Sequence, residues 1–209
     1  HTLPVMSLST DPENLFDPDT GIYVIGNKAA GKAPDQDEDP KGYVLAHGMD
    51  ASYATSSNFW QSWERPVHFD LIDETGASEY SGDGMVRIFG AFSRNKEQKG
   101  LSLIARAGYG GSTFQHAFFE DRPFTEYKSL VLRASAQDAT FSRIRDIVIT
   151  SLLGDHDLGL TGLSKIDVQA YRQLVVYLNG KYWGVYNLRE KISKHFLAQH
   201  FGVSNTDTI

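Results

Sequence analysis

Two alternating segments joined by Asn179 and Gly180 place the tightest constraint on the fold. Residues 173–178 and 181–188 alternate in the manner of β-strands that bury one face. Asn-Gly accepts the positive φ angles of a type I′ turn, which joins two antiparallel strands directly. The sequence therefore predicts a β-hairpin here, and with it an antiparallel sheet.

Further strands are predicted upstream of this hairpin, as short apolar or β-branched runs bounded by Gly, Asp and Pro turns. They occupy residues 3–8, 21–24, 67–72, 79–89, 101–105 and 129–133. Val67, Phe69 and Leu71 alternate with polar neighbours, so we expect these three side chains to face the core. Strands 67–72, 79–89 and 101–105 follow one another through local turns, which predicts an antiparallel meander.

Two helices are predicted late in the chain, each from apolar residues at helical spacing followed by a glycine. The first carries Phe141, Ile144, Ile147, Val148 and Leu152 before Gly154, and the second carries Ile192, Phe196, Leu197 and Phe201 before Gly202. We expect Asp138 to be the N-cap of the first helix and Asp146 to pair with an arginine. The predicted class is α+β, with a mostly antiparallel sheet and at least two helices.

The charge balance excludes a broad nucleic-acid-binding surface. The 20 Lys and Arg residues face 26 Asp and Glu residues, a formal net charge of −6, so an anion site must be a local cluster. The 41% hydrophobic residues are enough for a real core, but no apolar run reaches the roughly 18–20 residues of a membrane span. The absence of cysteine excludes disulfides and thiolate metal sites.

The chain is expected to be a single-domain fragment of a longer protein. It begins with a histidine, carries no signal peptide, and ends in the polar run Ser-Asn-Thr-Asp-Thr-Ile, which closes no element. Residues 28–42 contain no apolar side chain larger than alanine and are predicted to form an exposed, mobile loop.

The segment Val86–Arg106 is the strongest local indication of an anion-binding site. It contains two predicted strands joined by a polar turn that concentrates Arg94, Lys96 and Lys99 between two glycines. Glycine lets backbone N–H groups approach an anion, and Lys or Arg neutralises its charge. A solvated basic turn is the alternative interpretation.

Tryptophans and histidines suggest two other kinds of site. Trp60, Trp63 and Trp183 could form stacking surfaces for a glycan or a protein, or they could simply cover the core. A metal-dependent hydrolase would draw on His47, His68, His116 or His156. No two of these histidines share ligand spacing, and the run of residues 155–157, Asp-His-Asp, is also ordinary loop composition.

Taken in order, the motifs of the chain resemble the CotH kinase family, the spore coat protein H-like kinases of bacteria. They run from the N-terminus to the late hairpin: Leu3-Pro4-Val5, Gly21-Ile22-Tyr23-Val24, Arg65-Pro66-Val67-His68, Val86-Arg87-Ile88, Ser93-Arg94, Gln98-Lys99, Ser129-Leu130-Val131-Leu132-Arg133, Arg145-Asp146 and residues Tyr177–Glu190. Gly100 and Ala134 depart from the Ser and Asn that are usual in the family.

The resemblance implies an atypical protein-kinase-like fold, of which this chain is the nucleotide-binding half. The implied activity is phosphate transfer from ATP, with Mg²⁺ or Mn²⁺, to Ser or Thr of a protein substrate, at the bacterial surface or outside the cell. Lys99 on its strand would contact phosphate, with Arg87 and Arg94 as neighbours and Glu190 at the start of the late helix as the orienting carboxylate. The catalytic and metal-holding aspartates of the family lie beyond residue 209, so the fragment alone is expected to be inactive. A non-catalytic binding or assembly module is the alternative.

Overall fold

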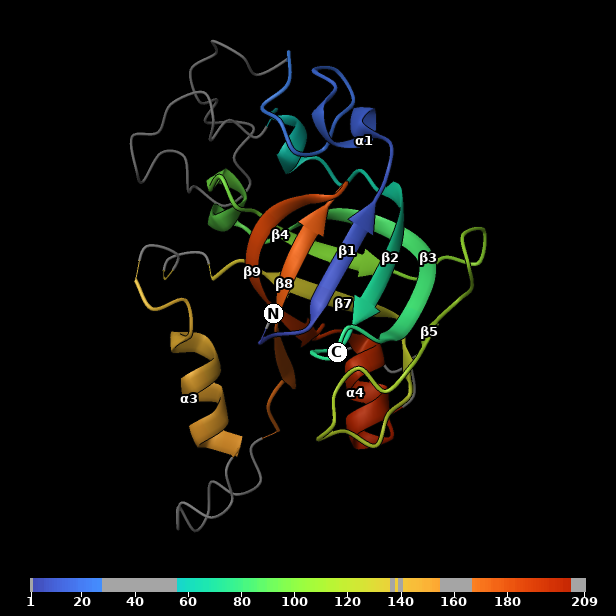
Figure 1. The fold of residues 1–209 in the computed structure, drawn as a ribbon, viewed down its shortest axis with the longest axis vertical. Coiled ribbons are helices and arrows are strands. Elements are labelled where there is room, and N and C mark those ends of the chain that lie inside the picture. Colours follow the sequence, from blue (N-terminus) through green and yellow to red (C-terminus); the bar gives the residue numbers. More distant parts are fainter. Residues whose placement is uncertain (1, 28–55, 136–137, 139–140, 155–166, 204–209) are drawn as a thin grey trace.

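The computed structural model describes residues 2–27, 56–135, 138, 141–154 and 167–203. Its centre is a closed barrel of seven strands in the order β1-β2-β3-β4-β7-β9-β8 (Figure 1). The strands are β1 (Val5–Ser9), β2 (Arg65–Ile72), β3 (Ser78–Phe89), β4 (Gly100–Ile104), β7 (Ser129–Arg133), β8 (Tyr171–Leu178) and β9 (Lys181–Glu190). The predicted α+β class, dominated by antiparallel pairing, is confirmed.

The barrel is closed by β1, which pairs antiparallel with β2 and parallel with β8. All the other neighbours in the barrel are antiparallel, including the predicted meander of β2, β3 and β4. Val67, Phe69 and Leu71 are buried in the core, as their alternation predicts. Closure through β1 joins segments far apart in the sequence, which local patterns do not reveal.

The β8–β9 hairpin is confirmed in detail. Leu178 pairs with Lys181, and the two residues between them have the positive φ angles of a type I′ turn, 49° at Asn179 and 78° at Gly180. The predicted strand at residues 21–24 is wrong. Ile22 and Tyr23 are buried in a turn there, so their apolar character reflects packing against the core and not strand pairing.

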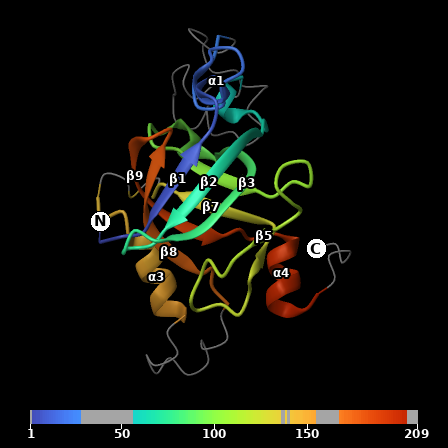
Figure 2. The ribbon, with the colours of Figure 1, turned by 45° about the vertical axis from the view of Figure 1, so that its right-hand side comes forward.

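Short helical elements and loops close the two ends of the barrel (Figures 1 and 2). One end carries α1 (Pro12–Phe16) and the 3₁₀ helices η2 (Asn58–Trp60) and η3 (Phe92–Asn95). The other end carries α4 (Lys194–Phe201) and the small hairpin of β5 (Phe114–Gln115) and β6 (Glu126–Tyr127). Within the described residues, no helix is long and apolar enough to cross a membrane. The loop predicted at residues 28–42 lies outside the described residues.

The two predicted late helices both exist but start later than expected. Helix α3 covers Arg145–Gly154, and the Asp138 carboxylate caps it from outside by accepting the Arg145 N–H at 3.1 Å. Helix α4 starts after its N-cap Ser193 and ends at Gly202, whose φ of 65° is that of a C-cap glycine.

The apolar face predicted for α3 is largely not buried, which corrects the expectation. Ile147 is buried, whereas Phe141, Ile144, Val148 and Leu152 are exposed. The helix is held instead by its polar side, because Asp146 binds Arg133 and Arg189 of the sheet. The predicted arginine partner of Asp146 is thereby confirmed.

Candidate functional site

A row of side chains crosses the outer face of the sheet formed by β3, β4, β7 and β9. The strand register places Arg87 opposite Ser102, Ser102 opposite Val131, and Val131 opposite Arg189. Their sequence neighbours Ile88, Leu101, Leu132 and Leu188 belong to the barrel core. Because successive side chains of a strand point to opposite faces, the four members of the row face outward.

Arg189 is the most deeply buried cation of this row, at 2% exposure. Its Nη1 contacts the Asp146 carboxylate of α3, and the same carboxylate lies 3.2 Å from Arg133 Nη1. Burial lowers the pKa of Arg189, and the charge of Asp146 opposes that effect. Arg189 Nε is buried without a hydrogen-bond partner. One helix carboxylate thus orients two arginines of the sheet.

Arg87 and Lys191 are two further cations on this face, and within the described part of the chain neither makes a hydrogen bond or an ion pair. The Nε atom of Arg87 is buried and unpartnered. Lys191, which follows β9, is half-buried, and its pKa is lowered first by burial and next by the positive charge of Arg87. Two cations that repel each other beside an unpartnered N–H form a site suited to an anion.

A carboxylate close to both cations, that of Glu64, is already engaged. Arg106 binds Glu64 through two contacts, of 2.9 Å from Nε and 2.5 Å from Nη2, and these hydrogen bonds hold the pKa of Glu64 below its usual range. Glu64 therefore stays ionised, but its oxygens are directed to Arg106. The charges of Arg87 and Lys191 also lower the pKa of Glu64, but in the described part of the chain neither cation forms an ion pair. We call Arg87 and Lys191 the outer cation cluster.

Lys99 and Arg94, two of the predicted phosphate contacts, bind backbone carbonyls instead of facing the outer cation cluster. Lys99 directly precedes β4 and is not on the strand, and its Nζ donates to the carbonyls of Arg94 at 2.7 Å and Lys96 at 2.9 Å. Arg94 Nη1 donates to the carbonyls of Phe59 and Trp60, both at 3.1 Å. These bonds tie the polar turn of Val86–Arg106 to η2.

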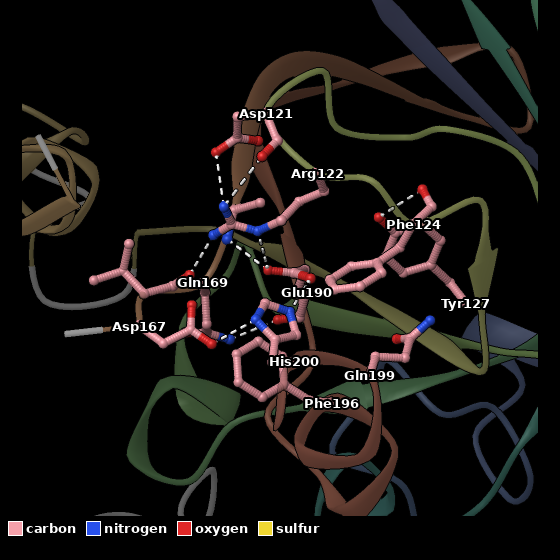
Figure 3. A network of polar contacts seen from close by, with 12 residues as sticks. Asp121, Arg122, Phe124, Tyr127, Asp167, Gln169, Glu190, Phe196, Gln199 and His200 are labelled. Atoms are coloured by element: carbon pink, nitrogen blue, oxygen red, sulfur yellow. Dashed lines mark hydrogen bonds and ion pairs between the residues drawn. The ribbon is translucent and has the colours of Figure 1, made fainter. Parts of the chain in front are cut away.

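Glu190 is the last residue of β9 and does not open a helix, which corrects its predicted location (Figure 3). Its carboxylate accepts from His200 Nε2 at 2.8 Å, from the Ala170 N–H at 2.8 Å and from Arg122 Nε at 3.3 Å. The other ring nitrogen of His200 contacts Asp167 at 2.5 Å. This buried network fastens α4 to the barrel.

The structure therefore does not bring Lys99 and Glu190 together. Glu190 is paired with Leu130, and Leu130 with Leu103, which lies four residues after Lys99. Four residues of strand correspond to about 13 Å along the barrel. The lysine lies between η3 and β4, and the glutamate lies at the end of β9 that leads to α4.

The described tryptophans pack against the core, and His68 forms ion pairs on the surface. Trp60, Trp63 and Trp183 are partly buried and pack against the core, which confirms the covering role. His68 binds Asp83 at 2.7 Å and Asp70 at 3.3 Å. In the part of the chain that the structure describes, no three His, Asp or Glu side chains gather in a group that could hold a metal ion. His47 and residues 155–157 lie outside that part.

Sequence reasoning found Arg87 and the arginine pairing of Asp146, but it missed Arg189 and Lys191. The missed signal was the alternation of β9. Leu188 and Tyr186 are core residues, so Arg189 had to project from the opposite face of the same strand. Placing Arg189 beside the residues of β7 also requires the pairing of β7 with β9, which depends on the barrel topology.

Comparison with known proteins identifies the family. No curated protein matches the chain. A family model described as "CotH kinase protein" matches residues 86–209, which is more than half of the chain and includes every member of the outer cation cluster. The chain belongs to the CotH kinase protein family.

Proposed function

We propose that this chain is the nucleotide-binding part of a protein kinase that transfers phosphate from ATP to Ser or Thr hydroxyls of a protein substrate. The observation that carries the proposal is the outer cation cluster, where Arg87 and Lys191 lie close enough to repel each other and neither forms an ion pair among the described residues. Membership of the CotH kinase family supports the reaction class. By the same resemblance we propose that the complete protein acts at the bacterial surface or outside the cell.

The arrangement of α3 supports the proposed kinase function by analogy. In protein kinases a helix carboxylate pairs with a cation of the nucleotide-binding sheet, and the pair must be in place for phosphoryl transfer. Here Asp146 of α3 pairs with Arg189 and Arg133 of the sheet. We infer that Asp146 performs the orienting role that the resemblance had suggested for Glu190.

The residues present fit the phosphates of ATP. Phosphoryl transfer depends mainly on positioning and on neutralising negative oxygens, and the outer cation cluster can do both. Arg87 offers an unpartnered Nε–H together with its terminal N–H groups, and Lys191 offers a half-buried ammonium. A divalent metal would neutralise further phosphate charge, but the described residues include no group of metal ligands, so we derive no step through a metal ion.

Of the four residues first proposed to contact the nucleotide, Arg87 has the geometry that favours contact. Lys99 and Arg94 donate to backbone carbonyls, and Glu190 is enclosed by Arg122 and His200. A contribution of Lys99 to ATP binding remains a prediction of the family resemblance.

Titration calorimetry of the 209-residue chain with ATP tests the proposal. Arg87→Gln should weaken ATP binding about tenfold or more, because a charge-assisted hydrogen bond contributes roughly 1.5–3 kcal/mol. Lys191→Gln should have a similar effect. The control is Lys181→Gln at the opposite end of β9, which is exposed at the hairpin turn and should bind ATP as the unmodified chain does. Undiminished binding by both Arg87→Gln and Lys191→Gln would reject the outer cation cluster as the phosphate site.

A further inference from the structure

An open depression of about 460 Å³ lies against the outer face of β1, β2 and β3, where β1 leads into α1 (Figure 1). Ser9, His68 and Asp83 form one row across these three strands, and all three line the depression. Their sequence neighbours Leu8 and Val67 are buried in the core, so the row faces outward, toward the depression. The volume lies within the range of small-molecule sites, about 300–1,000 Å³.

A chain of hydrogen bonds fixes the wall of the depression on the α1 side. Asn14 Nδ2 donates to Thr10 Oγ1 at 2.9 Å, and Thr10 Oγ1 donates to the Pro66 carbonyl at 2.5 Å; all three residues line the depression. Among the described residues, Asn14 Oδ1 accepts no hydrogen bond, and the one partner of the Asp83 carboxylate is His68 Nδ1, at 2.7 Å. The depression therefore presents positioned oxygen acceptors that the protein itself leaves largely unused.

Tyr109 forms another part of the wall, on a turn that is held against β3. Its side chain is 47% exposed, and within the described residues its hydroxyl makes no hydrogen bond and its ring stacks on no other ring. The Tyr109 N–H donates to the Arg106 carbonyl at 2.7 Å. A Cβ atom on Gly110 would lie 2.7 Å from the Asp83 carbonyl oxygen, so a glycine is needed for the turn to approach β3 this closely. The turn thus places an exposed aromatic ring beside the oxygen acceptors.

We propose that this depression binds a neutral sugar residue of a glycan. The C–H groups on one face of a sugar ring carry a small positive charge and pack on the negative face of an aromatic ring, here that of Tyr109. Sugar hydroxyls donate hydrogen bonds, which Asp83 and Asn14 Oδ1 accept. The carboxylates of Asp11 and Asp83 disfavour an anionic ligand. The site is distinct from the proposed ATP site, because Asp83 lies four residues before Arg87 on β3, about 13 Å along the strand.

A microarray of neutral and sialylated oligosaccharides, probed with the fluorescently labelled 209-residue chain, tests this proposal. We expect binding to neutral oligosaccharides. Tyr109→Ala should weaken it about tenfold or more by removing the stacking face, and Asp83→Ala should do the same by removing a hydrogen-bond acceptor. Tyr182→Ala is the matched control, because Tyr182 is 61% exposed at the β8–β9 turn and its loss should leave binding unchanged. Circular dichroism verifies that each variant is folded.

Three results on the array would overturn the proposal: no neutral oligosaccharide bound, binding confined to sialylated oligosaccharides, or equal binding by the unmodified chain, Tyr109→Ala and Asp83→Ala. Decalysine tests whether the carboxylates of the depression recognise a basic peptide instead. A chain that binds decalysine through Asp83, with Tyr109→Ala binding it equally well, and that binds no neutral oligosaccharide would assign the depression to basic peptides. None of these results bears on ATP binding, so the proposed kinase function is tested separately.

Discussion

At the residue scale, the unusual feature is a small set of cations that form no ion pair, in a chain whose net charge is −6. Arg87 and Lys191 lack partners on the described outer face, and Lys99 is buried against backbone carbonyls. Leaving a buried cation without a counter-charge destabilises a protein, so such positions are candidates for function. The two cases differ, because Arg87 and Lys191 lie close to each other on the outer face of the sheet, whereas Lys99 donates to carbonyls of its own turn.

Burial of Lys99 predicts a stability that increases at alkaline pH. Its pKa is about 8 when folded and near 10.5 when unfolded, so between these values the unfolded chain binds more protons and stability rises with pH. From pH 7 to pH 10 the gain should be about 2 kcal/mol. The measurement is urea unfolding at both pH values for the unmodified chain and Lys99→Met.

The Lys99→Met variant should lack this gain, because its side chain does not titrate. Lys181→Met, which removes an exposed lysine, should keep the full gain and controls for the titration of other groups. The pKa assignment is contradicted if the unmodified chain and Lys99→Met change in parallel between the two pH values.

At the element scale, helix α3 is attached through charge more than through apolar packing. Its carboxylate Asp146 holds Arg189, which is buried, and Arg133, which is partly exposed, while most of its apolar residues face outward. Asp146 is therefore the main charged anchor of the helix.

Asp146→Asn should destabilise the chain by about 2–3 kcal/mol, because it leaves the buried Arg189 without a counter-charge. Urea unfolding followed by circular dichroism measures this. Asp121→Asn is the matched control, since Asp121 is exposed and its partner Arg122 also pairs with Glu190, so its loss should cost less than about 1 kcal/mol. Equal effects of the two substitutions would show that Asp146 does not anchor α3.

The elements themselves differ in how well the sequence predicts them. The β8–β9 hairpin and the buried face of β2 follow from local turn chemistry and alternation, and both are as expected. The helical periodicity of residues 141–152 correctly indicates a helix but misleads about burial, because periodicity reports an apolar face without saying what covers it. Ile22 and Tyr23 pack against the core from a turn and do not form a strand. A short stretch of sequence cannot distinguish these two reasons for apolar residues.

At the scale of the whole molecule, the candidate site is a product of topology. Arg87, Ser102, Val131 and Arg189 come from four strands, and only the barrel order β3-β4-β7-β9 aligns them in one row. Sequence reasoning could identify the individual cation Arg87 but not its neighbours. The same topology separates Lys99 from Glu190, a pairing that family resemblance had suggested.

The most direct measurement of the central claim is the NMR signal of the Arg87 Nε–H group during titration with ATP. Arg87 Nε has no partner among the described residues, so a phosphate oxygen that accepts from it should shift this signal and slow its exchange with water. We expect the shift with ATP and not with adenosine, which has no phosphate. A signal that stays unchanged at saturating ATP, or that moves equally with adenosine, would contradict the assignment of the outer cation cluster as the phosphate site.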